Sequence, residues 1–313
     1  MRLFKFLTNA LGQCTWAGTV GKACAAFLIL QAPCWALQVT DDRQAPVTFE
    51  RSPQRIVSLL PSLTESVCAL GQCQRLVGVD KYSNYPASVR QLPQLGGGMD
   101  ANIEAIVALR PDVVLMALSS RAHERLQALG IKVLTLEPKN YADVRRVLGV
   151  LGQLLEIVPA QGADRVWREM DAGVQAAAQS LPAGVRNWRV YFEVDRAPYA
   201  AGEASFIGET LTRLGVKNII PQALGAFPLI NPEFVVRASP DVVMVGDRNY
   251  QGMTNRTGWS TMPAIKSARV CVFQSDDSDV LVRPGPRMAE AARTMAACLS
   301  KTYAASRSGA AKP

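Results

Sequence analysis

The chain has 313 residues, a formal net charge of +8 and a single histidine. This length suits two domains of ordinary size, and a hydrophobic content of 49% is enough for a substantial core. One histidine excludes a His-rich metal site. The cations are scattered and form no basic block, so they do not indicate nucleic-acid binding, although an anionic ligand or surface remains compatible with the charge.

Residues 1–36 are predicted to be an export signal. Arg2, Lys5 and Lys22 are the only charges in this segment, an apolar run follows over residues 23–30, and the small residue Ala36 comes directly before residue 37. This order resembles a secretory signal peptide that is cleaved after Ala36. The apolar run is too short to span a bilayer. Cleavage would remove three cations and lower the formal net charge from +8 to +5. We therefore expect a soluble, exported protein, with an uncleaved membrane anchor as the alternative.

The mature chain is expected to begin with an exposed lead over residues 37–53 and then to alternate between strands and helices. Buried-type strands are predicted over residues 55–60, 75–79, 113–116 and 132–136. Helices are predicted between them, and a further helix follows over residues 141–155. Such alternation favours a parallel α/β sheet.

A long helix is predicted over residues 158–182. Its apolar residues recur every three or four positions, Pro159 suits a first helical turn, and Pro182 with Gly184 closes the far end. We interpret it as the link between two copies of one unit.

The sequence pattern restarts after this helix. Residues 189–193 form another strand-like run, and Glu209 precedes Gly215 by six residues, as Glu65 precedes Gly71. Residues 231–243 match residues 102–114, with Asn, Glu, Val, Pro, Asp, Val and Val at identical offsets. We predict an α/β fold with two Rossmann-like lobes, residues 54–157 and 186–303, a ligand cleft between them and a flexible tail over residues 304–313.

Four cysteines would remain after cleavage: Cys68, Cys73, Cys271 and Cys298. An even number in an exported chain favours disulfides, with three pairings open. Cys68 and Cys73 flank a helix end and could bridge locally. Cys271 lies in a strand-like run and Cys298 in the last helix, so that pair could tie the end of the chain to its sheet. The alternative is free, buried thiols.

Ligand-binding side chains are expected near the carboxyl ends of the strands. The candidates are Ser62, Tyr82, Tyr199, Phe227, Asp276 and Arg283. The aromatic rings suit a bulky, partly apolar ligand. Arg283 lies in a loop stiffened by two prolines, where a guanidinium could bind a carboxylate or phosphate through two hydrogen bonds. The alternative is that these residues anchor the core or the loops.

Glu104 and Glu233 occupy equivalent positions in the repeat, each two residues after an Asn cap. An acid in the first turn of a helix complements the helix dipole, and that structural role is sufficient to explain each residue alone. The functional alternative is a matched pair of exposed carboxylates, one per lobe, that docks onto a two-fold symmetric partner carrying arginines.

Together these segments resemble the periplasmic binding proteins of ABC importers for cobalamin, haem and iron–siderophores, with the cobalamin-binding members most similar. The resemblance runs from about Arg55 to Leu299 and includes Thr64-Glu65, the segment from Tyr82 to Pro86, and Asn102-Ile-Glu104. It implies two α/β lobes joined by one long helix, and a monomer that delivers a metal chelate to an inner-membrane ABC permease with its cytoplasmic ATPase. It also implies that Glu104 and Glu233 dock onto permease arginines, and it places the ligand near Tyr82, Tyr199, Phe227, Asp276 and Arg283.

The departures from that family concern the ligand. Two tryptophans of the cobalamin-binding cleft are replaced near Gly98 and Ala117, and the loop from Asp276 to Arg283 is longer. A corrinoid is the first candidate and a ferric siderophore the second. Haem is less favoured because we expect His123 to be solvated, although Tyr82 or Tyr199 could supply a tyrosinate ligand.

An exported two-lobe enzyme and an interaction protein without a ligand are the rival classes. No phosphate-binding glycine motif, nucleophile elbow, His-based dyad or metal cluster occurs in the sequence. We therefore predict no catalytic residue, no resident cofactor and no protein-bound metal. Turnover of a substrate would contradict that prediction.

Overall fold

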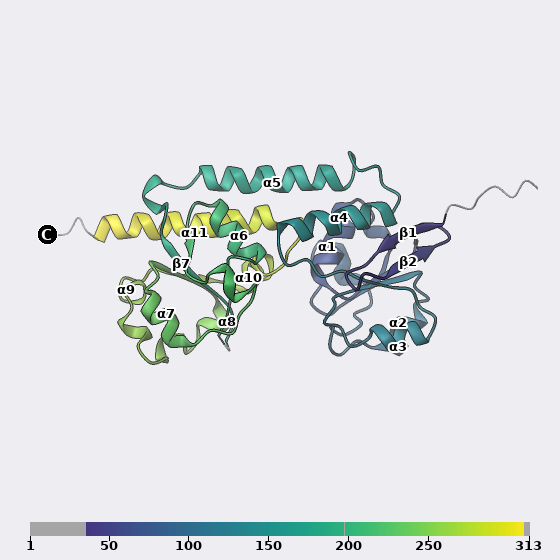
Figure 1. Cartoon of the computed structure of the whole chain (residues 1–313), viewed down its shortest axis with the longest axis horizontal. Helices are drawn as coiled ribbons and strands as arrows, with labels where there is room; N and C mark the ends of the chain where they lie inside the picture. The colour runs from purple at the N-terminus through teal and green to yellow at the C-terminus, as the bar shows by residue number, and fades with distance from the viewer. Residues whose placement is uncertain (1–35, 197, 310–313) are drawn as a thin grey trace, which may run out of the picture. The chain divides into compact units, whose positions relative to one another are not determined.

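The computed structural model describes residues 36–196 and 198–309, which contain two parallel sheets with helices on their faces (Figure 1). Nearly all of the predicted signal peptide lies outside the described residues. The sheet that comes first in the chain has the order β4-β3-β5-β6, and all of its pairs are parallel. Its strands are β3 (Ile56–Ser58), β4 (Leu76–Val79), β5 (Val113–Met116) and β6 (Val133–Thr135). We call the part of the chain built around it the first lobe.

The sheet of the second lobe repeats this order. Its parallel strands run β9-β7-β10-β11, and the short β8 pairs antiparallel with the end of β7. The strands are β7 (Arg189–Asp195), β8 (Tyr199–Ala200), β9 (Lys217–Asn218), β10 (Val242–Gly246) and β11 (Val270–Phe273). The predicted repeat and the α/β fold class are therefore confirmed.

The helices follow the strands in chain order. In the first lobe they are α1 (Pro61–Ala69), α2 (Ile103–Ala108), α3 (His123–Ala128) and α4 (Tyr141–Leu154). In the second lobe they are α6 (Phe206–Arg213), α7 (Pro232–Ala238), α8 (Asp247–Tyr250), α9 (Pro263–Lys266), α10 (Ser275–Leu281) and α11 (Met288–Gly309). Short 3₁₀ turns cover Cys73–Arg75, Ala87–Gln91, Ala183–Val185, Gln222–Leu224, Met253–Asn255 and Trp259–Thr261. None of the described helices is both long enough and apolar enough to cross a membrane.

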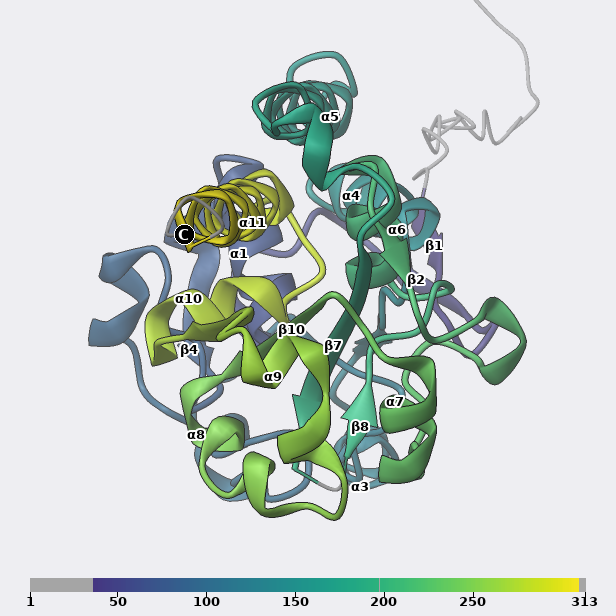
Figure 2. The same ribbon diagram turned by 90° about the vertical axis from the view of Figure 1, so that its left-hand side faces the viewer.

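The connecting helix is α5 (Ala163–Gln179), which packs along α4 and α11 (Figures 1 and 2). It buries the apolar stripe that the sequence predicted, including Val166, Met170 and Val174. It is shorter than predicted at both ends. Pro159 lies in a turn that precedes Gly162, the residue before the helix, rather than in the first helical turn.

One apolar core runs through both lobes and α5. It includes Ile56 and Leu115 from the first sheet and Val190 and Met244 from the second, together with Met170 of α5. Alternate residues of the same strands point to the opposite faces, because successive side chains of a strand alternate. There they form two separate cores, one within each lobe. The shared core therefore joins the lobes on the face that carries α5.

Two predictions for the ends of the mature chain were wrong. The expected exposed lead forms a hairpin of β1 (Leu37–Thr40) and β2 (Pro46–Phe49), in which Val39 and Phe49 are buried. Residues 304–309 of the expected flexible tail are helical, because α11 continues to Gly309, and residues 310–313 lie outside the described residues.

The structure pairs the four cysteines of the described residues in two disulfides. Cys68 is joined to Cys73 just beyond α1, and Cys271 of β11 is joined to Cys298 of α11. The second bridge connects the last helix to the sheet beneath it.

Candidate functional site

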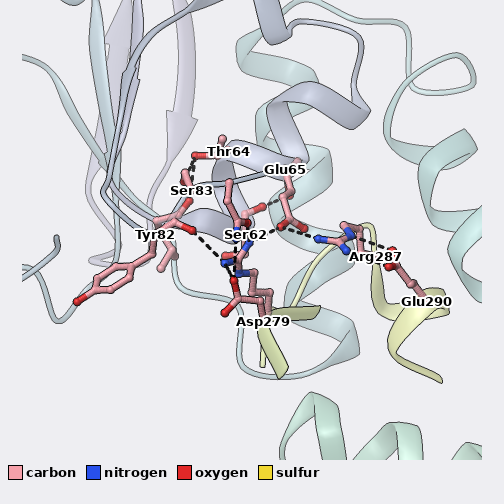
Figure 3. A network of polar contacts seen from close by, with 12 residues as sticks. Ser62, Thr64, Glu65, Tyr82, Ser83, Asp279, Arg287 and Glu290 are labelled. Atoms are coloured by element: carbon pink, nitrogen blue, oxygen red, sulfur yellow. Dashed lines mark hydrogen bonds and ion pairs between the residues drawn. The ribbon is translucent and has the colours of Figure 1, made fainter. Parts of the chain in front are cut away.

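Loops at the carboxyl ends of the two sheets meet in one polar contact zone. Asn84, in the loop after β4, donates through Nδ2 to Oδ2 of Asp279 on α10 at 2.9 Å, and its Oδ1 accepts from Nη1 of Arg283 at 2.7 Å. Figure 3 shows Tyr82 and Glu65 of the first lobe beside Asp279 and Arg287 of the second. We call this zone the interlobe seam. The residues that form it are Ser62, Glu65, Tyr82, Asn84, Tyr85, Asp279, Arg283 and Arg287.

A pocket of about 140 Å³ opens at the carboxyl ends of β7, β10 and β11. Its polar lining includes Glu193, Asp247, Arg248, Asn249, Ser278 and Asp279. Asp279 belongs both to this pocket and to the interlobe seam, so the two are continuous. The volume is below the 300–1,000 Å³ that is usual for sites that enclose a small molecule. It can therefore take part of a ligand but cannot enclose a large one.

The charge of Glu193 in this pocket is balanced within the protein. Glu193 is buried, and both of its carboxylate oxygens accept hydrogen bonds from Arg256. The Tyr191 hydroxyl also donates to it, at 3.1 Å. Burial is the main cause that raises the pKa of Tyr191 far above its usual range, and the neighbouring carboxylate adds to it. The tyrosine therefore stays a neutral donor at physiological pH.

The loop that carries Tyr82 is held from within the first lobe. Asp80 is buried, and its carboxylate accepts from the Tyr82 backbone N–H at 2.8 Å and from the Ser83 hydroxyl. Ser83 also contacts the Thr64 hydroxyl at 2.9 Å. Burial raises the pKa of Asp80, against the lowering effect of its hydrogen bonds. The backbone of Tyr82 is thus fixed by hydrogen bonds while 59% of the residue remains exposed.

Arg283 makes its contacts inside the protein. Only 7% of the residue is exposed. Nη1 donates to Glu65 at 2.9 Å and to Asn84, and Nη2 donates to the Tyr82 carbonyl at 2.9 Å and to Asp279 at 2.7 Å. The guanidinium that we expected to bind a ligand carboxylate or phosphate therefore contacts groups of both lobes in this structure.

Glu65 is the buried acid of the interlobe seam. Its Oε1 accepts from Arg283 and, at 3.5 Å, from Arg287, whereas its Oε2 is buried with no hydrogen-bond partner among the described residues. Burial raises the pKa of Glu65, and the two arginines oppose that shift. In the sequence Glu65 belongs to the repeat and to the family resemblance, and an acid at the same place in both copies is the signal that could have indicated a contact between lobes.

The other predicted ligand residues differ in their exposure to solvent. Tyr199 on β8 and Phe227 are exposed, and Phe227 also packs on Phe206 with ring centroids 5.9 Å apart. Ser62 is buried at the start of α1, and its hydroxyl has no partner in the described part of the chain. Asp276 is exposed in the first turn of α10 and does not line the pocket.

The segment from Asp276 to Arg283 was expected to be a loop, and this was wrong. Residues 275–281 form α10, so Asp279 lies one helical turn before Arg283 and pairs with it. The spacing of four residues between an acid and an arginine was the sequence signal for this pair. It indicates Asp279, and not Asp276, as the acid of the interlobe seam.

The expectation that His123 is solvated was also wrong. The residue is 8% exposed at the start of α3, and its Nδ1 has no partner among the described residues. Burial lowers the pKa of His123, and the charge of Arg43 lowers it further. Within residues 36–196 and 198–309, no group of three or more His, Cys, Asp or Glu side chains is placed to hold a metal ion.

Glu104 and Glu233 occupy matching places in the two lobes. Each lies in the first turn of a short helix, α2 or α7, behind an asparagine cap that accepts a backbone N–H. Both residues are exposed. Among the described residues, Glu104 forms an ion pair only with Arg125, at 3.4 Å. Such a surface pair contributes little to stability, so both carboxylates are available to a partner.

Two parallel α/β lobes, one connecting helix and exposed aromatic rings at the carboxyl ends of the strands define a two-lobe solute-binding protein. Comparison with known proteins agrees with this class. The family model described as periplasmic binding protein matches residues 56–276, and the chain belongs to this family. Proteins similar to it are named as vitamin B12-binding, heme-binding and possible iron-binding proteins.

Three proteins illustrate the range of similarity. An uncharacterised ABC transporter substrate-binding lipoprotein of Bacillus subtilis, YvrC, is 29% identical, over 82% of this chain and 83% of its own. The vitamin B12-binding protein of Pectobacterium carotovorum is 26% identical, over 79% of this chain and 89% of its own. The crystal structure of a periplasmic heme-binding protein from Pseudomonas aeruginosa superimposes with a TM-score of 0.66 at 26% identity, over 80% of this chain and 93% of its own.

Proposed function

We propose that the protein captures a metal chelate, with cobalamin or another corrinoid as the first candidate, and delivers it to an ABC import permease. The observation that carries the proposal is the exposure of two tyrosines in different lobes. Tyr82 follows β4 in the first lobe, and Tyr199 pairs with Asp195 at the carboxyl end of β7 in the second. Large exposed rings there offer apolar faces with polar tips to a bulky, partly apolar ligand. The vitamin B12-binding relatives support this choice.

The size of the pocket beside the interlobe seam suggests that a ligand would bind to two surfaces, the pocket and the exposed aromatic rings. At about 140 Å³ it has room for a side arm of a chelate but not for a macrocycle. We propose that the macrocycle packs on Tyr82, Tyr199 and Phe227 and that a polar arm enters the pocket near Asp279. Ser62 and Asp276 are retained as candidate ligand contacts at the edge of this surface.

A ferric siderophore is the second candidate, and haem the third. His123 is buried with Arg43 as its neighbour, so it is a poor axial ligand for haem iron. A tyrosinate from Tyr82 or Tyr199 remains the alternative route to haem, and the heme-binding structural relative supports keeping it. Non-covalent capture requires no catalytic residue, and the relatives are named as binding proteins.

The partner in this proposal is an inner-membrane permease with its ATPase, approached by a monomer in the periplasm. Glu104 and Glu233 are the proposed docking carboxylates, one per lobe, because they are exposed and equivalently placed. Export would depend on residues 1–36 acting as the signal peptide.

The test is a calorimetric titration of the mature protein with cyanocobalamin, haemin and a ferric siderophore, each also followed by the absorbance of the chelate. We expect one of them to bind with a one-to-one stoichiometry, and cyanocobalamin most tightly. Binding of a different chelate would overturn the corrinoid assignment, and binding of none would overturn the metal-chelate proposal. Consumption of the ligand would instead support the enzyme alternative.

A further inference from the structure

The two lobes contact each other at two places, and each contact is made by a glutamate at the same position of the repeat. Glu65 on α1 and Glu209 on α6 are equivalent in the repeat, since each precedes by six residues a glycine with positive φ at its helix end. These glycines, Gly71 at +77° and Gly215 at +81°, adopt the left-handed conformation that commonly ends a helix. Glu65 contacts arginines that precede the last helix of the second lobe, and Glu209 contacts the first residue of α4, the last helix of the first lobe.

The first of these contacts lies in the interlobe seam. Glu65 accepts from Arg283 at 2.9 Å and from Arg287 at 3.5 Å, directly before α11 begins at Met288. The Arg287 guanidinium also covers the ring of Tyr85 in the first lobe, 4.0 Å from its centroid. We call Glu65, Arg283 and Arg287 the first clasp, and Figure 3 shows Glu65 beside Arg287.

The second contact is its counterpart on the other lobe. Glu209 accepts through Oε2 from the backbone N–H of Tyr141, the first residue of α4, at 2.7 Å. The Tyr141 hydroxyl contacts the Thr210 hydroxyl at 2.9 Å, and the Arg213 guanidinium lies 4.1 Å from the Tyr141 ring centroid. We call Glu209, Thr210, Arg213 and Tyr141 the second clasp.

The two clasps differ in what else they touch. Arg283 of the first clasp donates to the Tyr82 carbonyl and to Asn84, so it reaches from the second lobe into the loop that presents the exposed Tyr82 ring. Within the described part of the chain, no hydrogen bond or ion pair joins the second clasp to that loop. A change at Glu65 should therefore alter both the lobe arrangement and the Tyr82 loop, whereas a change at Glu209 should alter only the lobe arrangement.

We infer that Glu65 and Glu209 are equivalent clasps that fix the two lobes relative to each other, and that Glu65 and Arg283 are positioning residues for Tyr82. The part that concerns Tyr82 rests on the proposed function. In this inference Arg283 acts on the ligand through the loop, because its Nη1 and Nη2 already donate to four protein oxygens. These four oxygens account for the buried charge of Arg283 without a ligand anion.

The first experiment measures the distance between lobes in the mature protein. Spin labels attached without cysteine chemistry at Leu129 and Leu224, which are exposed in different lobes, report the distribution by pulsed electron resonance. We expect a narrow distribution in the wild type and a broader one in both Glu65→Ala and Glu209→Ala. Glu65→Gln should restore part of the narrow distribution, because the amide oxygen still accepts from Arg283.

The second experiment measures affinity for the chelate that binds in the titration. We expect Glu65→Ala to weaken binding about tenfold, and to weaken it more than Glu209→Ala does, because Glu65→Ala disturbs the Tyr82 loop as well as the lobe arrangement. Unfolding curves for each variant check that the protein remains folded.

Unchanged distance distributions in both alanine variants would overturn the inference that Glu65 and Glu209 fix the lobes relative to each other. Equal affinities of wild type and Glu65→Ala would overturn the positioning role. If none of the chelates binds the wild type, the proposed function fails, but the distance measurement still decides whether the clasps exist.

Discussion

At the scale of single residues, burial separates side chains of the same type into different roles. Tyr82 presents an exposed ring, whereas Tyr191 is fully buried and donates to Glu193. Arg283 is buried in the interlobe seam and Arg125 is on the surface beside Glu104. Sequence position suggested which residues follow strands, but it could not tell which of their side chains reach solvent.

The ring of Tyr82 should contribute directly to ligand affinity. We expect Tyr82→Ala to weaken chelate binding about tenfold or more, because packing of a large aromatic face is worth on the order of 1–2 kcal/mol. Tyr82→Phe keeps the ring and should stay within about threefold of the wild type, unless the hydroxyl binds iron. Calorimetric titration measures both variants, and equal affinity of wild type and alanine variant would remove Tyr82 from the site.

His123 should make the protein less stable in mild acid. Its pKa in the folded protein is lowered, chiefly by burial, with Arg43 adding to the shift and Asp41 and Glu124 opposing it. Below the ordinary histidine pKa near 6.5, His123 is therefore protonated in the unfolded chain while it stays neutral in the folded protein. Stability is fully present above that value and is lost as the pH falls toward the lowered pKa.

Replacement by glutamine removes this titration. We expect the urea midpoint of His123→Gln to fall less than that of the wild type between pH 7.5 and pH 5.5. Identical pH dependence in the two proteins would show that His123 is accessible to protons in the folded state.

At the scale of elements, local patterns predicted most helices and strands. The predicted strand over residues 113–116 is β5, and the helix predicted over residues 141–155 is α4, within one residue. Both have a strong apolar pattern and clear ends. The hairpin of β1 and β2 was missed because its strands are four residues long and its stability comes from packing on α4.

The disulfide between β11 and α11 should stabilise the protein more than the one beside α1. Cys271 and Cys298 are 27 residues apart, whereas Cys68 and Cys73 are 5 apart. A crosslink that closes a longer loop removes more entropy from the unfolded chain, which predicts a difference of about 1.5 kcal/mol. We expect Cys271→Ala with Cys298→Ala to lower the unfolding free energy by that much more than Cys68→Ala with Cys73→Ala in urea titrations. A larger loss in the second pair would contradict the loop argument.

At the scale of the whole molecule, the repeat places one exposed carboxylate on each lobe at equivalent positions. We expect Glu104→Arg with Glu233→Arg to leave ligand affinity unchanged and to abolish uptake in cells, because the reversed charges would repel arginines of a permease. Glu50→Arg with Glu169→Arg is the matched control, since both residues are exposed and the change in net charge is the same. Loss of affinity in the first pair, or normal uptake, would show that these residues do not form the docking surface.

The repeat, the parallel α/β class and the connecting helix could be predicted from local patterns, because apolar periodicity and the glycines that end helices act over a few residues. The tertiary structure decided which polar groups meet. Glu65 and Arg283 are 218 residues apart, and no local pattern assigns them to each other. Their contact forms only when the shared core has fixed both lobes against α5, and that packing turns a predicted ligand residue into a link between the lobes.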